Sequence, residues 1–424
     1  MKIPSAWLAA VLCLVTVSLV EAQGLPTARP EQVGLSLERL NRLTARLKAD
    51  VDRGAIPGGV VLVARHGRVA LFEAIGVRNP ETKAPMTKDA IFRIYSMSKP
   101  ITSVSAMMLF EEGKFSLADP VSKYIPELGG LKVGVEKPDP SGKPTLELVP
   151  SQRDMTIHDL FRHTSGLTYG FFGNSLVKKM YVEAKISDDY PSNAELAARL
   201  GKMPLAYQPG TTWDYSYSTD VLGRLIEVIS RQTLYQYEKE RVLDPLGMKD
   251  TSFYVTDKNK QDRIAEPFAN DRNIGANADF NDPRVAQAWE SGGGGMVGTA
   301  MDYARFLQML LNGGTLDGKR ILGPKTIAYM TADHLGASIT PGPLYLPGAG
   351  FGLGFAVRKD PGVSPFIGSV GELNWGGAGG TYFWVDPKEE LLVVFMMQSP
   401  KQRVPYRAVL KEMVYAAITK PAAK

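Results

Sequence analysis

Two stretches near the ends of the chain repeat apolar residues every three or four positions, which is the period of one helix face. They cover residues 37–52 and 404–418, and each predicts an amphipathic helix packed against other structure. The apolar stripe of the first consists of Leu40, Leu43, Leu47 and Val51, and that of the second of Tyr406, Leu410, Met413 and Ala417.

Continuous runs of apolar and β-branched residues occupy the outer thirds of the chain and predict strands. Residues 58–65 and 69–76 flank a short connection, residues 66–68, whose glycine suits a hairpin. Three more strand-like runs follow late in the chain, at residues 351–358, 381–385 and 391–397.

The middle of the chain has a different pattern. Residues 97–290 contain helical periodicities and little that indicates a strand, and a loop rich in proline and glycine is expected at residues 135–145. A further helix is predicted at residues 301–313, where two glycines end the pattern.

Strands in both outer parts around a helical middle predict an α/β (α+β) fold. We expect one antiparallel sheet, built from both ends of the chain and flanked by helices. The expected unit covers residues 23–424, with the α/β parts at about 30–96 and 291–424 and a mostly helical part at about 97–290.

The first residues have the pattern of a secretion signal. Lys2 precedes a mostly apolar run over residues 6–20, and the small side chains of Val20 and Ala22 suit a signal peptidase. The run is shorter than the ~18–20 residues of a membrane-spanning helix. We therefore expect residues 1–22 to be a cleaved signal peptide, the protein to be periplasmic or secreted, and no stable membrane anchor to remain.

Composition excludes several kinds of function. The 424 residues are 44% hydrophobic and 22% charged, which is typical of a globular protein. The one cysteine, Cys13, lies in the predicted signal peptide, and this excludes thiol catalysis and cysteine-based metal or redox sites. The formal net charge of +5 is distributed over both signs without a run of five like charges, so nucleic acid is not an expected partner.

Histidines and glycine runs give no sign of a metal or cofactor. The histidines lack the spacing of a zinc site, and without a Gly-x-Ser-x-Gly motif a Ser-His-Asp triad is disfavoured. Glycine runs at residues 292–295 and 376–380 lack the ending of a phosphate-binding loop, so no cofactor is expected. The four histidines are His66, His158, His163 and His334.

The segment Ser96-Met97-Ser98-Lys99 opens an apolar helical pattern that ends near Gly113. Residues three apart on a helix lie side by side, so the Lys99 amine can reach the Ser96 hydroxyl and act as its base. A structural alternative is that Ser96 caps the helix and Lys99 extends to solvent. Ser175 and Lys178 have the same spacing, so the tetrapeptide alone does not decide between the two interpretations.

Two further motifs follow in order and give a resemblance. They are Pro209-Gly210-Thr211-Thr212-Trp213-Asp214-Tyr215-Ser216-Tyr217 and Trp375-Gly376-Gly377-Ala378-Gly379-Gly380-Thr381. Together with the Ser-x-x-Lys segment they resemble the serine β-lactamase and penicillin-binding-protein superfamily, most of all class C β-lactamases and family VIII carboxylesterases. The segments at residues 163–167 and 293–300 are also similar, and the resemblance covers about residues 30–420.

The resemblance implies a role for each matching residue. Ser96 would attack the acyl carbon, with Lys99 beside it and Tyr215 as the proton acceptor or relay, a role that requires a cation near the phenol. The backbone N–H groups of Ser96 and Ala378 would form the oxyanion hole. Substrate would contact Tyr217, Trp375, Gly376 and Gly377.

Two departures from the β-lactamase pattern favour esters as substrates. Trp375 stands where those enzymes have a lysine that suits the antibiotic carboxylate, and Tyr217 stands where they have an asparagine that binds an amide. Aromatic side chains at both places favour apolar acyl or alcohol groups. Because Tyr215 and Tyr217 are two residues apart, the sequence alone leaves open an exchange of their roles.

The prediction is therefore a serine hydrolase that cleaves small-molecule carboxylic esters through an acyl-Ser96 intermediate. One alternative is hydrolysis of β-lactams or of D-amino-acid peptides, or a related transpeptidase activity, against which Trp375 argues. Another is a catalytically silent member of the same fold that only binds a ligand.

Overall fold

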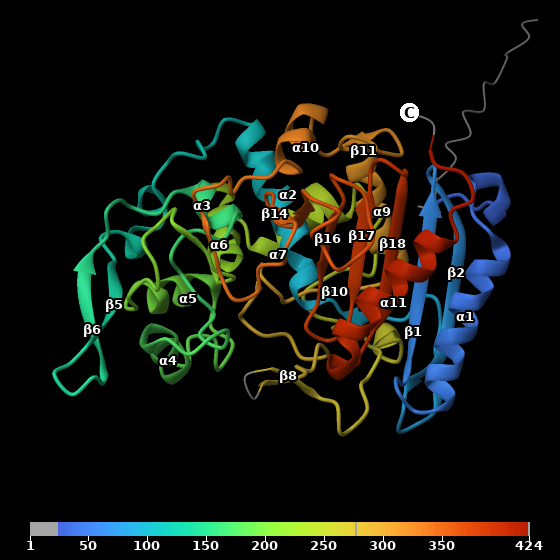
Figure 1. Ribbon diagram of the computed structural model, residues 1–424, viewed down its shortest axis with the longest axis horizontal. Coiled ribbons are helices and arrows are strands. Elements are labelled where there is room, and N and C mark those ends of the chain that lie inside the picture. The colour runs from blue at the N-terminus through green and yellow to red at the C-terminus, as the bar shows by residue number, and fades with distance from the viewer. Residues whose placement is uncertain (1–23, 276–277, 423–424) are drawn as a thin grey trace, which may run out of the picture.

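An eight-stranded antiparallel sheet forms the centre of the protein, and strands from both ends of the chain build it (Figure 1). The computed structural model describes residues 24–275 and 278–422, so the predicted signal peptide lies outside the described residues. In spatial order the strands are β14 (Ala349–Phe351), β15 (Ala356–Arg358), β16 (Leu373–Gly376), β17 (Tyr382–Asp386), β18 (Leu391–Met397), β1 (Gly58–Arg65), β2 (Arg68–Asn79) and β3 (Ala84–Pro85).

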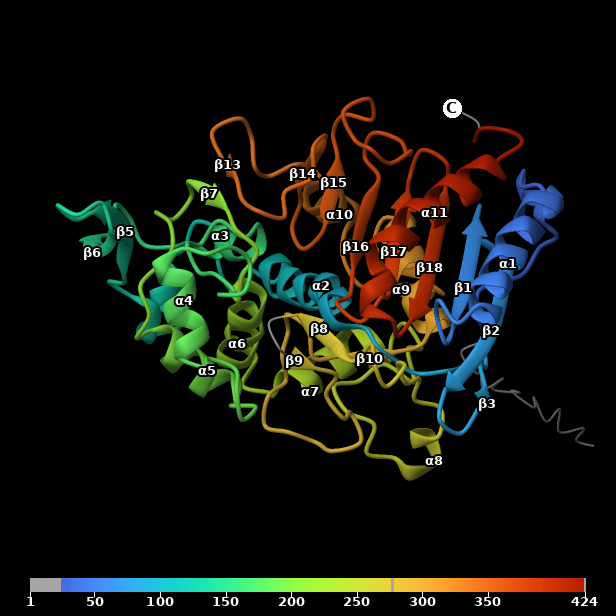
Figure 2. The same ribbon diagram turned by 60° about the horizontal axis from the view of Figure 1, so that its bottom comes forward.

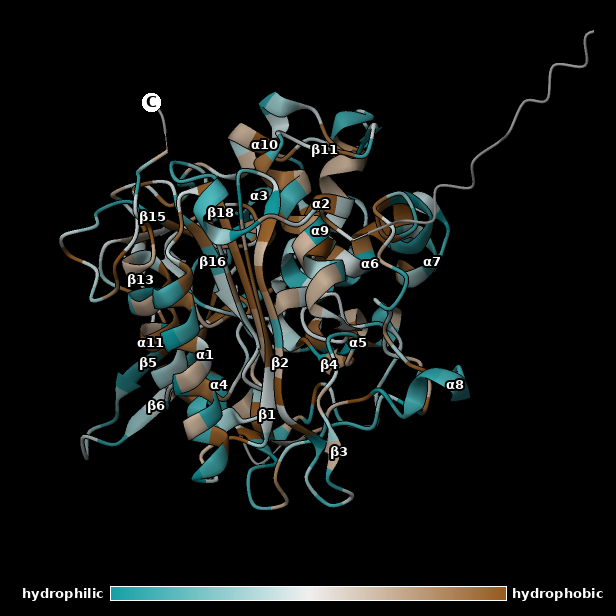
Figure 3. Cartoon of the chain, turned by 90° about the vertical axis from the view of Figure 1, so that its right-hand side faces the viewer, coloured by the Kyte–Doolittle hydropathy of each residue, from teal (hydrophilic) through white to brown (hydrophobic). Residues whose placement is uncertain are grey.

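The inner strands are apolar on both faces because both faces are covered. Along β1, Val61 and Val63 face one hydrophobic cluster, whereas Val60 and Leu62 face another. The strands in the middle of the sheet are accordingly brown in Figure 3. This two-sided burial explains why the sequence shows continuous apolar runs there instead of an alternating pattern.

Helices α1 (Leu37–Asp52) and α11 (Arg403–Ala416) cover the first face of the sheet. The bounds of α1 are those predicted from the sequence, and the Ser36 hydroxyl caps its first turn by accepting a hydrogen bond from the Arg39 N–H. Helix α9 (Ala300–Leu311) lies on the opposite face, and the helix predicted at residues 301–313 is thereby confirmed.

Helix α2 (Ser98–Glu111) lies between the sheet and the helical part of the chain (Figure 2). Its side chains are buried all around from Ser98 to Leu109, so this part of the helix has no solvent-exposed face. A 3-10 turn, η2 (Tyr95–Met97), precedes it. Ser96 therefore lies in this turn and not in the first turn of the α-helix as the sequence predicted.

Helices outnumber strands among the elements of residues 97–290, and the loop predicted at residues 135–145 is wrong. Residues 135–145 are not a loop but the greater part of a hairpin, because β5 (Lys132–Pro138) and β6 (Pro144–Pro150) pair along their whole length. The hairpin projects from the helical part (Figure 1). The helices here are α3 (Ile157–Phe161), α4 (Leu176–Glu183), α5 (Asn193–Leu200), α6 (Ser218–Ser230), α7 (Leu234–Glu238) and α8 (Lys258–Gln261).

Residues 351–358 also differ from the prediction of a single strand. They end β14 and form β15, joined by a turn in which Gly354 has a φ of +107°. Such a φ favours glycine, so this residue permits the reversal. Within residues 24–275 and 278–422, no helix is both long enough and apolar enough to span a membrane.

The remaining short elements join distant parts of the chain. Strand β4 (Phe92–Arg93) pairs with β10 (Val297–Gly298), and β7 (Thr212–Trp213) pairs with β13 (Thr340–Pro341). These pairs fasten the segments before Ser96 and before Tyr215 to the later part of the chain. Two-stranded ribbons β8 (Asn273–Gly275) with β9 (Ala278–Asp279) and β11 (Thr315–Leu316) with β12 (Lys319–Arg320), together with helix α10 (Pro324–Met330), complete the larger elements.

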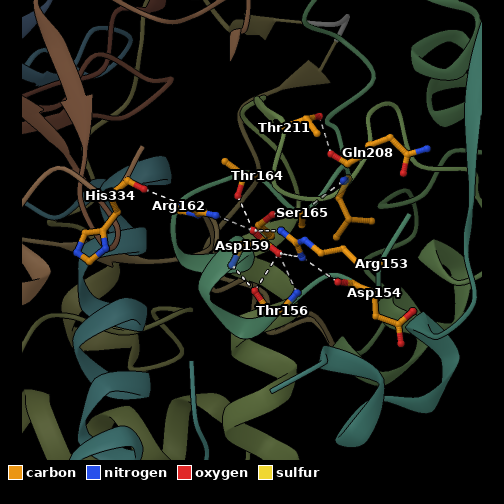
Figure 4. A network of polar contacts seen from close by, with 12 residues as sticks. Arg153, Asp154, Thr156, Asp159, Arg162, Thr164, Ser165, Gln208, Thr211 and His334 are labelled. Carbon is orange, nitrogen blue, oxygen red and sulfur yellow. Dashed lines mark hydrogen bonds and ion pairs between the residues drawn. The ribbon is translucent and has the colours of Figure 1, made fainter. Parts of the chain in front are cut away.

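A polar network around Asp159 holds the loop that follows α3 (Figure 4). The Asp159 carboxylate accepts hydrogen bonds from Arg153, Arg162, the hydroxyl of Thr164, and both the backbone and the hydroxyl of Thr156. Burial alone would raise the pKa of Asp159, but these hydrogen bonds lower it to about 2. The loop beginning at residue 163 is therefore fixed by a charged carboxylate with several hydrogen-bond donors.

Candidate active site

The hydroxyl of Ser98 holds the turn that carries Ser96. The Ser98 hydroxyl donates to the Tyr95 carbonyl (2.7 Å) and accepts from the Met296 N–H (3.1 Å). Tyr95 has a φ of +44°, a conformation that non-glycine residues adopt only when their surroundings enforce it. Ser96 itself is partly exposed, and no hydrogen bond among the described residues occupies its hydroxyl.

Lys99 is fully buried at the start of α2 and faces three groups. Its Nζ donates to the Gly293 carbonyl (2.6 Å) and to the Tyr169 hydroxyl (3.1 Å). It also lies 4.3 Å from the centre of the Tyr215 ring. No carboxylate within the described residues pairs directly with this amine, so the lysine is free to serve the phenol beside it.

A buried carboxylate, that of Asp220, is linked to Lys99 through one intervening residue. Asp220 on α6 accepts hydrogen bonds from the Tyr169 hydroxyl (3.2 Å), the Ser291 hydroxyl (2.5 Å) and the Gly293 N–H (3.2 Å). Burial raises the pKa of Asp220, while Lys99 and these hydrogen bonds act against that shift. Gly293 thus donates its N–H to the Asp220 carboxylate and accepts a hydrogen bond from the Lys99 amine with its carbonyl.

Tyr169 connects Lys99 to Asp220, and sequence reasoning missed both Tyr169 and Asp220. Burial raises the pKa of Tyr169 well above its usual range, and the Asp220 carboxylate adds to this effect. Tyr169 is therefore a neutral phenol that accepts from the lysine and donates to the carboxylate. Its one signal in the sequence is its place directly after the segment 163–167.

Tyr215 lies between Lys99 and the strand that begins at residue 373. The indole N–H of Trp375 points at the Tyr215 hydroxyl, at a distance of 3.3 Å, and the two rings lie 5.3 Å apart. Tyr217 faces elsewhere, because its hydroxyl is 3.0 Å from that of Ser187. The structure therefore assigns the position beside the lysine to Tyr215 and leaves Tyr217 as a wall behind Tyr169, with ring centres 4.5 Å apart.

His163 lies behind Tyr215 and is fully buried. Its ring is 4.9 Å from the Tyr215 ring, and its Nδ1 is 3.2 Å from the Ser216 hydroxyl. Burial and the nearby Lys99 cation lower the pKa of His163 well below its usual value, so the ring is neutral. No described carboxylate contacts it, which leaves His163 without the acid that a Ser-His-Asp triad requires.

The glycine-rich segment after β16 lies against the turn that carries Ser96. Gly377 must be a glycine, since a Cβ there would clash with the Ile94 carbonyl. The Arg403 guanidinium donates to the Ala378 carbonyl (3.2 Å) and fixes this segment from α11. Gly376 faces the Arg407 side chain of α11.

The predicted site residues therefore form two groups. Tyr215 contacts both Lys99 and Trp375, and the segment of Gly377 and Ala378 adjoins the turn of Ser96. Tyr217 and Gly376 belong to the surrounding packing. The arrangement places a hydroxyl, an amine and a phenol at the N-terminal end of α2, where developing negative charge is favoured. Among the described residues, no group of three or more His, Asp or Glu side chains is arranged to hold a metal.

Comparisons with known proteins agree over most of the chain. The family model described as beta-lactamase matches residues 43–414. A Mycobacterium tuberculosis protein described as uncharacterized is 36% identical over 364 residues, which cover 84% of this chain and 88% of that protein. Esterase EstB of Burkholderia gladioli is 32% identical over 403 residues, covering 88% of this chain and 95% of EstB.

A solved structure gives the same picture of the fold. EstCE1, described as a hydrolase with promiscuous acyltransferase activity, superposes with a TM-score of 0.72 at 28% identity. The match covers 90% of this chain and 98% of EstCE1.

Proposed function

The chain belongs to the beta-lactamase family, and from this premise we propose that it is a serine hydrolase that cleaves carboxylic esters. Its esterase relative EstB supports a hydrolase. The observation that carries the narrower proposal is the position of Tyr215, which lies between the Lys99 amine and the Trp375 indole.

In the first half of the proposed reaction, the Ser96 oxygen attacks the ester carbonyl carbon. Its proton passes to Tyr215, whose phenolate is stabilised by the Lys99 cation beside the ring. The N–H groups of Ser96 and Ala378 hold the oxyanion, a contribution of about 3 kcal/mol for each such donor. The C–O bond to the alcohol then breaks, and the alcohol leaves with the proton from Tyr215.

In the second half, water replaces the alcohol. Tyr215 takes a proton from the water, the resulting hydroxide attacks the acyl carbon, and the Ser96 oxygen leaves and recovers its proton. The products are a carboxylic acid and the free enzyme. Asp220 keeps the site electrically balanced through Tyr169 and Gly293 while the proton moves.

Trp375 supports esters over β-lactams as substrates. Its indole occupies the place where the resemblance expects a lysine, and its N–H is directed at the Tyr215 hydroxyl instead of at solvent. The indole also lies among aromatic rings, 5.4 Å from that of Phe351. Such surroundings favour apolar groups over the carboxylate of an antibiotic.

The test compares Ser96→Ala with Ser175→Ala, which alters the other Ser-x-x-Lys segment. With p-nitrophenyl butyrate, Ser96→Ala should lose turnover by at least roughly 10³-fold, whereas Ser175→Ala should stay within about twofold of the natural enzyme. Intact-mass spectrometry with a slowly released ester should show an acyl adduct that Ser96→Ala lacks. Full activity in Ser96→Ala would reject the proposal. Faster turnover of nitrocefin than of the ester would favour β-lactams over esters as the substrates.

A further inference from the structure

Three loops beside the catalytic tyrosine contain no charged residue. Residues 163–177, 335–357 and 361–371 lack Asp, Glu, Lys and Arg altogether, in a chain that is 22% charged. Glycine is frequent in all three, and the second and third also contain prolines. A soluble protein normally covers its loops with charged side chains, so three such segments in one place require an explanation.

These loops expose large apolar side chains to solvent. Six side chains with exposed fractions between 39% and 58% lie on them, and we call this set the apolar rim. Isolated exposed apolar residues are ordinary, but a group on neighbouring loops marks an interaction surface. The apolar rim consists of Phe171, Leu344, Leu346, Val363, Ile367 and Val370.

The three loops adjoin one another, so the rim residues lie on neighbouring segments. Gly173 of the first loop lies against Pro343 of the second, whose Cγ would be 3.8 Å from a Cβ at position 173. The Gly348 carbonyl of the second loop accepts hydrogen bonds from the N–H groups of Lys359 (2.9 Å) and Asp360 (3.0 Å), directly before the third loop. The second and third loops lie around β13, β14 and β15 at the top of the view in Figure 2, whereas the first runs between α3 and α4.

The rim continues into the walls of the active site. The Phe171 ring lies 4.6 Å from that of Phe172, which lies 5.9 Å from that of Tyr215. From the second loop, Tyr345 packs on Trp213, with ring centres 5.9 Å apart. A surface that seats on the rim would therefore lie next to Tyr215.

We propose that the apolar rim docks on an uncharged lipid–water interface, from which the enzyme takes ester substrates with long apolar chains. The absence of charge on the rim is the reason for this choice. An anionic membrane is bound through lysine and arginine side chains, and a protein partner is normally bound by an apolar centre with a charged or polar border. Lys359 and Asp360, between the second and third loops, are exposed, but the Lys359 amine pairs with Asp333 (2.7 Å), so they add no cationic patch. An apolar surface with so few charges beside it matches neutral or zwitterionic lipid.

The inference about substrates rests on the proposed function, but docking does not, so the two can fail separately. Binding is measured on Ser96→Ala protein by flotation with phosphatidylcholine vesicles, with phosphatidylglycerol vesicles as a second arm. The rim variant carries Val363→Asp, Ile367→Asp and Val370→Asp, which leave Tyr215 and its neighbours untouched. The matched control is Val404→Asp on α11, a valine that is 59% exposed and far from the rim in sequence.

We expect phosphatidylcholine binding that persists in about 0.5 M NaCl, since the contact is not electrostatic. Binding should fall at least about tenfold in the rim variant and stay within about twofold in the control. In the catalytically intact background, the rim variant should keep its turnover of soluble p-nitrophenyl acetate, which also shows that it folds. Its turnover of an emulsified long-chain ester should fall at least about tenfold.

Several results would overturn the proposal. One is failure of the protein to bind phosphatidylcholine vesicles, and another is an equal loss of binding in Val404→Asp. Salt-sensitive binding confined to phosphatidylglycerol would assign the contact to charges elsewhere on the surface. The last outcome comes from analytical ultracentrifugation without lipid. If the natural protein is a dimer and the rim variant is a monomer, the rim binds a second copy of the chain instead of lipid.

Discussion

The chain contains two Ser-x-x-Lys segments with the same spacing and opposite surroundings. At the second, the Ser175 hydroxyl accepts a hydrogen bond from the Lys178 N–H and caps α4, while the Lys178 amine pairs with Asp214 (2.8 Å). At the first, no hydrogen bond from residues 24–275 or 278–422 occupies the Ser96 hydroxyl, and within these residues the Lys99 amine meets a carbonyl, a phenol and a ring instead of a carboxylate.

Under the proposed function, the partner of the lysine distinguishes the roles of the two segments. A direct carboxylate partner holds Lys178 as a fixed cation in a structural ion pair. At Lys99 the carboxylate of Asp220 is reached through Tyr169 and Gly293, so the charge is balanced while the amine stays available to Tyr215. Spacing brings two groups together, and the third group determines the chemistry.

The largest effect is expected from removing the amine of the first segment. Lys99→Met keeps the length of the side chain and should lower kcat on p-nitrophenyl butyrate by roughly 10²- to 10⁴-fold, the range for a catalytic acid or base. Steady-state kinetics and a near-native melting temperature are the measurements. Turnover within threefold of the natural enzyme would show that Lys99 has no role in the mechanism. The two Ser-x-x-Lys segments would then not differ in function.

Removing the amine of the second segment should act on stability. Lys178→Met leaves the Asp214 carboxylate buried without its cation and should lower the free energy of unfolding by about 3–5 kcal/mol. Urea unfolding measures this loss. The double variant Lys178→Met, Asp214→Asn should recover a large part of it, because no unpaired charge then remains. Equal stability of the single and double variants would show that the ion pair is not the cause.

The hydroxyl that links Lys99 to Asp220 offers a finer test of the first segment. Tyr169→Phe should lower kcat by roughly tenfold with little change in KM, since it alters the groups behind the proton path and leaves the substrate surface intact. Tyr181→Phe is the matched control, because the hydroxyl of that buried tyrosine has no partner among the described residues. The prediction fails if both variants change kcat by the same factor.

The loop that precedes the second segment depends on Asp159, and its contribution should vary with pH. The pKa of Asp159 is about 2 in the folded protein against 3.8 in an ordinary aspartate, so its contribution is complete above about pH 4 and is lost as the pH falls toward 2. Asp159→Asn should lower the free energy of unfolding by about 2 kcal/mol at pH 7.

Urea unfolding at pH 7 and pH 3 checks this expectation. The gap between the natural protein and Asp159→Asn should narrow at pH 3, while the exposed neighbour variant Asp154→Asn should change little at either pH. A gap that widens on acidification would contradict the sign of the pKa shift.

The smallest effect is expected from the helix cap of the second segment. Ser175→Ala removes the side-chain acceptor for the Lys178 N–H and should lower the free energy of unfolding by about 1 kcal/mol. The unfolding midpoint is the measurement, with Ser175→Asp as the control because aspartate also caps helices. If both substitutions destabilise equally, the cap has no role.

Elements with a buried face could be predicted from the sequence. The helix at residues 37–52 and the strand at residues 391–397 have the predicted bounds because burial imposes a clear periodicity or a continuous apolar run. The hairpin of β5 and β6 was missed because most of its side chains are exposed, so packing imposes no pattern on them.

The candidate site divides in the same way. Ser96, Lys99, Tyr215 and Trp375 could be selected because they belong to motifs with fixed spacing. Tyr169 and Asp220 could not, since each is an isolated polar residue whose partner lies about fifty or more residues away in the sequence. Only the tertiary fold brings them together.

The position of β1 in the sheet has a consequence for synthesis of the protein. β1 lies between β2 and β18, and β18 ends at residue 397, so its second neighbour emerges from the ribosome only after most of the chain. Until then β1 presents an apolar edge to any other chain, which makes the nascent protein prone to aggregation. A truncated protein that ends before residue 391, and so lacks β18, should therefore be insoluble even though it contains the whole segment around Ser96.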